Sequence, residues 1–380
     1  MKRLLLVTAI FISVLLLVPG VVLADNSQTT IGETDLAREA AQLWLDDISG
    51  KAASEIPQWQ GAIVTSPQSY NNLDGELNAY LFTIENRGVV GYILVSSAMY
   101  EYTMFQAGTV NPPAIPELDT AKEAIEKLGF KSDETMLGRP VDLLYTGIDG
   151  FYAVYEFANE KVAVNLIYGG ATLVSDLSMS MPPPEQYLSA KKSMQPPSIL
   201  TTGYKTLNMS CWKGSGRGWC GPCSGVSIGA YYRDYCGYED LYDPNADMYD
   251  ELYDTMETVE WGLFEGATWP WNYGPGFVEM TENSEGEYDN FDWDDNWAPG
   301  PDDYWTIVSD IDNGWPSGLA ILAEFHWRAI RGYYWVEQPW GNYYDIICTN
   351  SATNDSFEFL DWMELPGEPD VTWLVAIYDE

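Results

Sequence analysis

One cysteine stands where a helix dipole could activate it. Cys220 follows a glycine-rich stretch, residues 214–218, and precedes Gly221, Pro222 and a run of small and apolar residues that predicts a buried helix. Pro222 suits the first turn of a helix, because its missing N–H needs no partner there. The positive end of the helix dipole stabilises a thiolate and lowers the thiol pKa into the range of about 3.5–7.5. Cys220 is therefore predicted to be a nucleophile or a redox centre.

Residues 219–223 also spell Trp-Cys-Gly-Pro-Cys, the active-site pentapeptide of thioredoxins. In a thioredoxin this motif follows an apolar strand within a βαβ unit. Here it follows residues 212–218, whose glycines do not favour a buried strand. The context therefore favours a hydrolytic nucleophile. A thiol–disulfide oxidoreductase that uses Cys220 and Cys223, and a purely structural pair of cysteines, stay open as alternatives.

A thiol hydrolase needs an imidazole as general base and acid, and the sequence offers one candidate. His326 is the only histidine in the chain. Asn350 follows a strand-like run, residues 343–349, and the order Cys, His, Asn is that of papain. We therefore predict that Cys220, His326 and Asn350 form a catalytic triad. Asn350 could instead be an ordinary turn residue after a strand, and Asp345 is a less favoured group to orient the imidazole.

At these residues the chain resembles the papain-like cysteine peptidases of the bacteriocin-processing (double-glycine leader) type and, more loosely, streptopain. Residues 219–232 are similar to the nucleophile segment, and residues 311–333 to the segment that carries the histidine, ending in Gly332 and Tyr333. Asn350 stands where that family has Asp or Asn. The resemblance covers most of residues 205–355. It implies an α+β peptidase domain in which the cysteine helix packs on an antiparallel sheet that carries the histidine.

A fainter resemblance lies in the first half of the chain. Residues 79–96 are similar to the propeptide of streptopain-type enzymes, which implies a zymogen whose N-terminal domain blocks the cleft. Apolar periodicity predicts helices over residues 35–48 and 118–128. Runs rich in β-branched and aromatic residues predict six strands, residues 61–65, 79–85, 89–96, 141–145, 151–157 and 161–167. This α+β module contains no histidine and no cysteine.

Two departures from the family bear on catalysis. Gly214 occupies the position where the family has an oxyanion-stabilising Gln, so Ser215 or backbone N–H groups would have to substitute. Cys223 occupies a position usually held by Ser, Thr or Ala, and a Cys220–Cys223 disulfide would block the nucleophile. A catalytically silent cell-surface binding module on a peptidase-like fold therefore stays an alternative.

Charge and cysteine content restrict the partners. The 57 acidic and 18 basic residues give a net charge of −39, which repels nucleic acid and anionic membranes. The expected partner is a peptide or protein substrate, and the reaction needs no metal or organic cofactor.

An odd number of cysteines in a secreted chain allows two disulfides and one thiol, or no disulfide. The pairing stays open among Cys211, Cys220, Cys223, Cys236 and Cys348.

The domain plan begins with a secretory signal. Residues 1–24 carry a basic start, an apolar core and a small-residue cleavage site, so the protein is expected to be secreted or extracellular. A signal that remains uncleaved as a membrane anchor is the alternative. A pro or accessory domain follows at residues 25–178. An extended, proline-rich linker is predicted at residues 179–204 and the peptidase domain at residues 205–380.

The peptidase domain is expected to contain a helix over residues 305–311 and strands over residues 319–325, 326–336 and 343–349. Residues 282–303 are predicted to form an acidic, aromatic loop. Within it Asp292, Asp294 and Asn296 are spaced like the first ligands of a calcium loop. Trp297 stands where that loop needs glycine, so calcium binding is a minor alternative.

Overall fold

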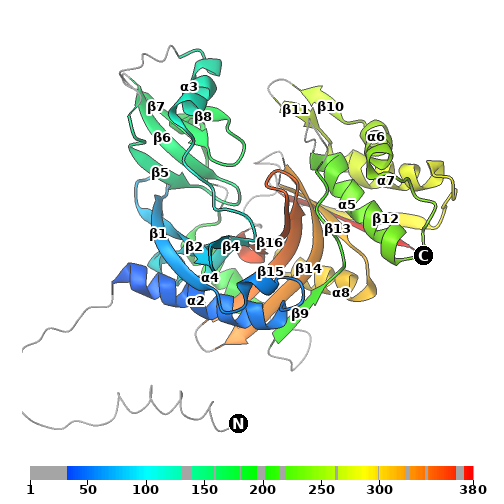
Figure 1. The fold of residues 1–380 in the computed structure, drawn as a ribbon, viewed down its shortest axis with the longest axis horizontal. Helices are drawn as coiled ribbons and strands as arrows, with labels where there is room; N and C mark the ends of the chain where they lie inside the picture. The colour runs from blue at the N-terminus through cyan, green and yellow to red at the C-terminus, as the bar shows by residue number, and fades with distance from the viewer. Residues whose placement is uncertain are drawn as a thin grey trace, which may run out of the picture. The chain divides into compact units, whose positions relative to one another are not determined.

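A computed structural model gives the fold of most of the chain (Figure 1). The predicted signal, residues 1–24, lies outside the described residues. Glu33–Glu380 forms one unit by its internal contacts, and the domain boundaries expected at residues 178 and 205 stay a prediction. No helix among the described residues is both long and apolar enough to cross a membrane. The described residues are 32–130, 138–157, 160–179, 181–194, 202–213, 220–261, 264–297, 299–321, 326–338, 341–364 and 372–379.

The first half of the chain is α+β, as its periodicity predicts. Both expected helices and all six expected strands form, with bounds shifted by a few residues. The sequence analysis missed β4, whose residues Met-Phe-Gln-Ala-Gly contain no β-branched side chain, and also the three-residue β8. The elements are α2 (Glu33–Lys51), β1 (Ile63–Asn71), β2 (Leu77–Glu85), β3 (Val89–Ser96), β4 (Met104–Gly108), α3 (Leu118–Lys127), β5 (Asp142–Tyr145), β6 (Phe151–Phe157), β7 (Glu160–Asn165) and β8 (Ala171–Leu173).

The second half supplies the cysteine helix and the strands that carry the histidine and asparagine. The helix predicted after Cys220 is confirmed as α5, which lies beside β13 and β14 in Figure 1. The elements are α4 (Pro184–Ser193), β9 (Thr202–Thr206), α5 (Cys220–Tyr235), α6 (Asn245–Thr255), β10 (Val259–Trp261), β11 (Phe264–Ala267), α7 (Pro270–Asn283), β12 (Phe291–Trp297), α8 (Tyr304–Asn313), β13 (Ser317–Ile321), β14 (His326–Gln338), β15 (Gly341–Asn350), β16 (Asp355–Asp361) and β17 (Thr372–Asp379).

One sheet of 15 strands runs through both halves, in the order β12-β17-β13-β14-β15-β16-β4-β3-β2-β1-β5-β6-β7-β8, with β9 paired to β14. The strand pairs from β13 to β16 are antiparallel. The two halves meet at β16 and β4, where Phe359 pairs with Ala107 and Leu360 pairs with Gln106. This arrangement is mixed α+β with a large sheet.

Two sequence-based expectations are wrong. The described residues 181–194 of the predicted linker are not extended, because α4 lies there and buries Tyr187 and Lys191. Residues 282–303 are not a loop, because β12 forms within them and pairs antiparallel with β17. The partner strand of β12 is β17, which lies about 80 residues later in the sequence. The local pattern of residues 282–303 therefore did not predict a strand.

The expected calcium ligands Asp292, Asp294 and Asn296 therefore occupy alternate positions of strand β12, not a calcium-binding loop. Within the described part of the chain, no group of three or more His, Cys, Asp or Glu side chains is placed to hold a metal ion.

Small residues in α5 allow close packing against its neighbours. A Cβ built on Gly229 would come within 2.5 Å of the Met248 sulfur on α6. A Cβ on Gly221 would come within 2.2 Å of Thr268 Oγ1. The run of small residues after Cys220 thus holds the start of α5 close to residue 268 and its middle close to α6.

A second buried group of side chains joins the two halves away from the cysteine helix. Trp44 of α2 donates from Nε1 to Asp345 Oδ2 of β15 at 3.0 Å. Tyr187 of α4 donates to Asp361 of β16, and Lys191 donates to Thr103 Oγ1 at 3.0 Å. Burial and the neighbouring Asp361 raise the pKa of Asp345 well above its ordinary value, opposed by Trp44 and Lys191.

We predict that replacing Asp345 with Asn makes unfolding less dependent on pH. A carboxyl whose pKa is raised by folding keeps its proton where the unfolded chain, with a pKa of about 3.9, has lost it. Its contribution to stability is therefore present at acid pH and is lost as the pH rises toward the folded-state pKa. Melting temperatures between pH 5 and 9 should fall less for Asp345→Asn than for the parent. Glu239→Gln, on an exposed carboxyl, is the control, and equal falls in all three proteins would contradict the prediction.

Candidate active site

Cys220 is the first residue of α5 and lies beside the first residues of β14. Its side chain is buried, with 9% of the residue exposed. The helix α5 packs against β14, and the backbone N–H of Trp327, the residue after His326, partly stabilises the Cys220 thiolate. The helix that carries the cysteine and the strand that carries the histidine therefore meet at the residues that the sequence singled out.

Aromatic packing holds this meeting point together. The Trp327 ring stacks on Tyr273 with centroids 4.1 Å apart and planes inclined by 10°. Its indole Nε1 donates to the Thr268 carbonyl at 3.0 Å, the same residue that Gly221 approaches. The Tyr273 hydroxyl is hydrogen-bonded to Ser224 Oγ of α5 at 2.9 Å. Residues 268–273 thus fix the start of α5 against the start of β14.

His326 and Asn350 are in direct contact. The distance from His326 Nε2 to Asn350 Oδ1 is 3.0 Å, and both residues are buried. His326 begins β14 and Asn350 ends β15, so the antiparallel pairing of these two strands brings them together. Asp345, the less favoured orienting group, accepts its hydrogen bond from Trp44.

A buried network continues from Asn350. Glu358 of β16 accepts from Asn350 Nδ2 at 3.0 and 3.1 Å, and from Arg328 Nε at 2.6 Å. Arg328 is fully buried and also forms an ion pair with Asp149. Burial and Asp149 raise the pKa of Glu358 to about 7, while Arg328 opposes this shift.

Two residues of the first half reach the histidine. The Tyr168 ring lies 5.6 Å from the His326 ring, and its hydroxyl donates to Asp149 Oδ2 at 2.5 Å. Asn165, the last residue of β7, forms hydrogen bonds to the turn that contains Asp149 and to the turn that contains Tyr168. Its Oδ1 accepts from the Ile167 and Tyr168 N–H groups at 2.8 and 2.9 Å, and its Nδ2 donates to the Asp149 carbonyl at 3.1 Å.

The thiol and the imidazole are both shifted toward their neutral forms. Burial and the nearby Arg328 lower the pKa of His326 to about 4, against the opposing effects of Asp149 and Asn350. Burial raises the pKa of the Cys220 thiol, although the Trp327 and Gly221 N–H groups partly compensate. The expected depression of the thiol pKa by the helix start is therefore wrong in this state, because desolvation outweighs the backbone groups.

All five cysteines are reduced thiols, so Cys220 is not linked to Cys223. Cys223 lies one turn further along α5 and is fully buried. Gly214, at the position of the oxyanion-stabilising Gln, and its expected substitute Ser215 lie outside the described residues, as does Trp219.

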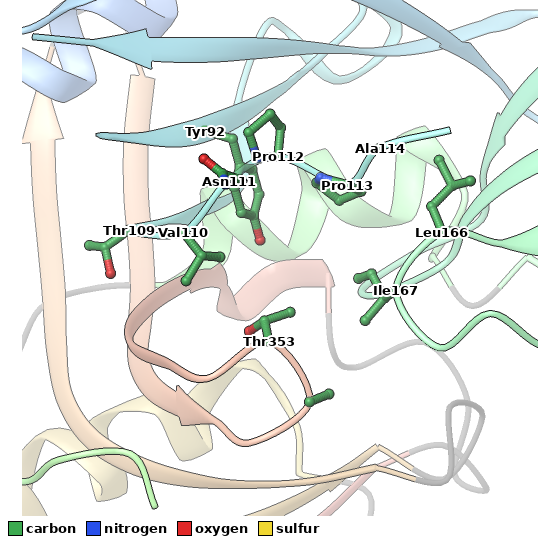
Figure 2. A pocket seen from close by; sticks show the side chains of 11 residues that line it. Tyr92, Thr109, Val110, Asn111, Pro112, Pro113, Ala114, Leu166, Ile167 and Thr353 are labelled. Carbon is green, nitrogen blue, oxygen red and sulfur yellow. The ribbon is translucent and has the colours of Figure 1, made fainter. Parts of the chain in front are cut away.

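A cavity of about 590 Å³ is lined by residues of both halves of the chain. Figure 2 shows residues 109–114 along one side of it, Leu166 and Ile167 on another, and Thr353 facing Val110. His326 and Asn350 do not line it. Its lining is connected to them, because Ile167 immediately precedes Tyr168 and the Ala352 N–H donates to Asn350 Oδ1 at 3.0 Å.

Sequence reasoning named Cys220, His326 and Asn350 as candidates. It missed the buried neighbours of His326 and Asn350, which are Asp149, Tyr168, Arg328 and Glu358. Their spacing gives no signal, because they come from four separate elements or turns. The one available hint was the presence of charges within apolar strand runs, Arg328 in residues 326–336 and Glu358 in residues 357–360.

Comparison with known proteins gives limited similarity. No family model matches the chain, and no curated protein matches it. Among solved structures, a mutant fragment of prointerpain A from Prevotella intermedia, a papain-like cysteine peptidase precursor, is similar. The match covers 82% of this chain and 98% of that one, with 10% sequence identity and a TM-score of 0.41. The function proposed below therefore rests on the geometry of the site.

We predict that the single histidine titrates near pH 4 in the folded chain. Burial disfavours the imidazolium, whereas the unfolded chain should titrate near its ordinary pKa of about 6.5. Since the folded state binds fewer protons between these values, the His326 contribution to stability falls as the pH drops from about 6.5 to 4. NMR titration of the imidazole resonances measures the midpoint directly. A midpoint near 6.5 in folded protein would contradict the prediction.

Proposed function

We propose that the protein is a secreted papain-like cysteine peptidase. The observation that carries the proposal is the 3.0 Å distance between His326 Nε2 and Asn350 Oδ1, on the strand against which the cysteine helix α5 packs. The three residue types are those of a thiol hydrolase, and each lies at the end of a regular element. Such ends are rigid and can still be reached by a substrate.

The proposed reaction is hydrolysis of a peptide bond. The Cys220 thiol gives its proton to His326 as the sulfur bonds to the substrate carbonyl carbon. The carbon–nitrogen bond then breaks, and His326 returns the proton to the leaving amine. Water hydrolyses the remaining thioester and regenerates the thiol. Asn350 accepts a hydrogen bond from the imidazole and fixes its orientation.

The proposal assigns residues 25–178 to an inhibitory N-terminal domain, residues 179–204 to the connection and residues 205–380 to the peptidase domain. Tyr168 and Asp149 support inhibition, because they contact His326 and its neighbour Arg328 from the first half of the chain. A buried thiol of raised pKa beside a neutral imidazole is a poor nucleophile. Moving these residues away would let water reach His326 and restore its basicity.

The proposed location is secreted or extracellular, with anchoring by an uncleaved signal as the alternative. The thiol–disulfide oxidoreductase stays an alternative, in which Cys220 would attack a substrate disulfide and Cys223, one helical turn further along α5, would resolve the mixed disulfide. A silent binding module on the same fold is the outcome if the protein hydrolyses nothing.

The first test compares the two neighbouring cysteines. We expect Cys220→Ala to lose about 10⁴-fold or more of peptidase activity, and His326→Ala to be about as damaging, because members of a catalytic unit are not additive. Asn350→Ala should be milder, since it orients the base. Cys223→Ser should retain most activity, because its side chain lies one turn away. Hydrolysis of a casein or gelatin substrate measures all four variants.

Equal inactivity of Cys220→Ala and Cys223→Ser, together with an active His326→Ala, would contradict the peptidase and favour disulfide exchange. Reduction of insulin by the parent protein would be the matching positive result. Inactivity of both the parent and Tyr168→Ala, in which the proposed inhibitory contact is removed, would leave the silent module.

The second test addresses inhibition by the first half. We expect Tyr168→Ala to increase both the rate of Cys220 alkylation by iodoacetamide and the rate of hydrolysis, because the ring over His326 is removed. Tyr168→Phe is the matched control, since it keeps the ring and loses only the hydrogen bond to Asp149. Unchanged rates in Tyr168→Ala would contradict a covering role for this residue.

A further inference from the structure

Glu358 lies at the centre of the network behind the candidate triad and has no role in the mechanism described so far. The residue is 1% exposed and lies on β16, next to the strand that ends in Asn350. Its carboxylate accepts from Asn350 Nδ2, from Arg328 Nε at 2.6 Å and from Gln106 Nε2 at 2.9 Å. All three of these donors are side chains.

This arrangement determines which way the Asn350 amide points. A carboxylate only accepts hydrogen bonds, so the Asn350 NH₂ must face Glu358, at 3.0 and 3.1 Å from its two oxygens. The Asn350 carbonyl oxygen then faces His326 Nε2 at 3.0 Å and the Ala352 N–H at 3.0 Å. An amide turned by 180° would place its NH₂ against the Ala352 N–H and its oxygen against the carboxylate.

The amide orientation in turn determines the histidine tautomer. Asn350 Oδ1 can only accept, so His326 Nε2 must carry the hydrogen. The lone pair of a neutral imidazole is then on Nδ1, and that nitrogen is the base. A neutral imidazole is the form that this site favours, because burial lowers the pKa of His326.

We propose that Glu358 is a positioning residue that, through Asn350, holds His326 in the Nε2–H tautomer and so makes Nδ1 the catalytic base. The catalytic role of Nδ1 rests on the proposed function. The tautomer of His326 does not, because it can be measured in a protein without activity. Arg328 supports the role, because its ion pair with Glu358 keeps the carboxylate in place between strands β14 and β16.

The test replaces Glu358 with Gln in the full chain. The new amide has one accepting oxygen for three donors, Arg328 Nε, Asn350 Nδ2 and Gln106 Nε2. When that oxygen serves the arginine, the Gln NH₂ faces Asn350 and favours the turned Asn350 amide. A turned amide presents NH₂ to His326 Nε2 and favours the Nδ1–H tautomer, which removes the base.

The first readout is ¹⁵N NMR of the imidazole, which is free of overlap because the chain has a single histidine. At pH 8.5, above the pKa of Glu358, the parent should show a protonated Nε2 and an unprotonated Nδ1. Glu358→Gln should show the Nδ1–H form or a mixture of the two. Glu364→Gln is the matched control, because that buried carboxyl binds Tyr145 and should leave the tautomer unchanged.

The second readout is the split between kcat and KM. Glu358→Gln should lower kcat by about ten- to a hundredfold, the range known for groups that orient a functional histidine, and should leave KM unchanged. The double variant with Asn350→Ala should lose no more than Asn350→Ala alone, because both changes act through the same amide.

A folded Glu358→Gln protein with the parent's tautomer and the parent's kcat overturns the proposal. If Glu358→Gln lacks the parent's near-UV circular dichroism, Glu358→Asp carries the test. A shorter carboxylate still only accepts, so the Nε2–H tautomer should persist, and an Nδ1–H tautomer there overturns the proposal. If neither the parent nor Tyr168→Ala hydrolyses a substrate while Glu358→Gln changes the tautomer, the peptidase function alone is overturned and the positioning of His326 is supported.

Discussion

The buried guanidinium of Arg328 is the charge on which the site depends. Arg328 is fully buried, and its positive charge is compensated by the carboxylates of Glu358 on β16 and of Asp149 in the first half. Removing one partner of a buried ion pair costs about 3–5 kcal/mol, because the remaining charge is left without solvent or a counter-ion. The two carboxylates therefore have to stay where they are while Arg328 is buried. Glu358 also binds Asn350, so the same constraint that neutralises Arg328 orients the histidine's partner.

The ion pair between Arg328 and Asp149 also affects the surroundings of His326. Asp149 comes from the turn after β5, and Asn165 links it to the turn that carries Tyr168. Pairing of Arg328 with Asp149 thus brings an aromatic ring close to His326. Desolvation then keeps the imidazole and the Cys220 thiol neutral. Neutrality of both groups is the physical sense in which this conformation is silent, and displacement of the two turns would change it without any change in the triad residues.

The sheet distributes these contacts across the chain. Only two residue pairs join β16 to β4. Buried hydrogen bonds between side chains of the two halves add to this pairing, from Gln106 to Glu358 and from Trp44 to Asp345. Buried hydrogen bonds of this kind contribute little net stability but are costly to break one partner at a time. They favour a specific docking of the first half rather than a loose association, which is what an inhibitory segment requires.

The sequence by itself determined the local features: the helix after Cys220, the strands around His326 and Asn350, and the α+β character of the first half. These features follow from short-range patterns, namely the residues of a helix start and the periodicity of apolar side chains. It did not reveal β12 inside the acidic stretch, α4 inside the proline-rich stretch, or the raised thiol pKa. Each of these depends on neighbours distant in the sequence, β17 for β12 and the surrounding core for Tyr187 and Cys220. Only the tertiary structure brought Asp149, Tyr168, Arg328 and Glu358 to the triad residues, because charges from four segments become one network only when the sheet has buried them together.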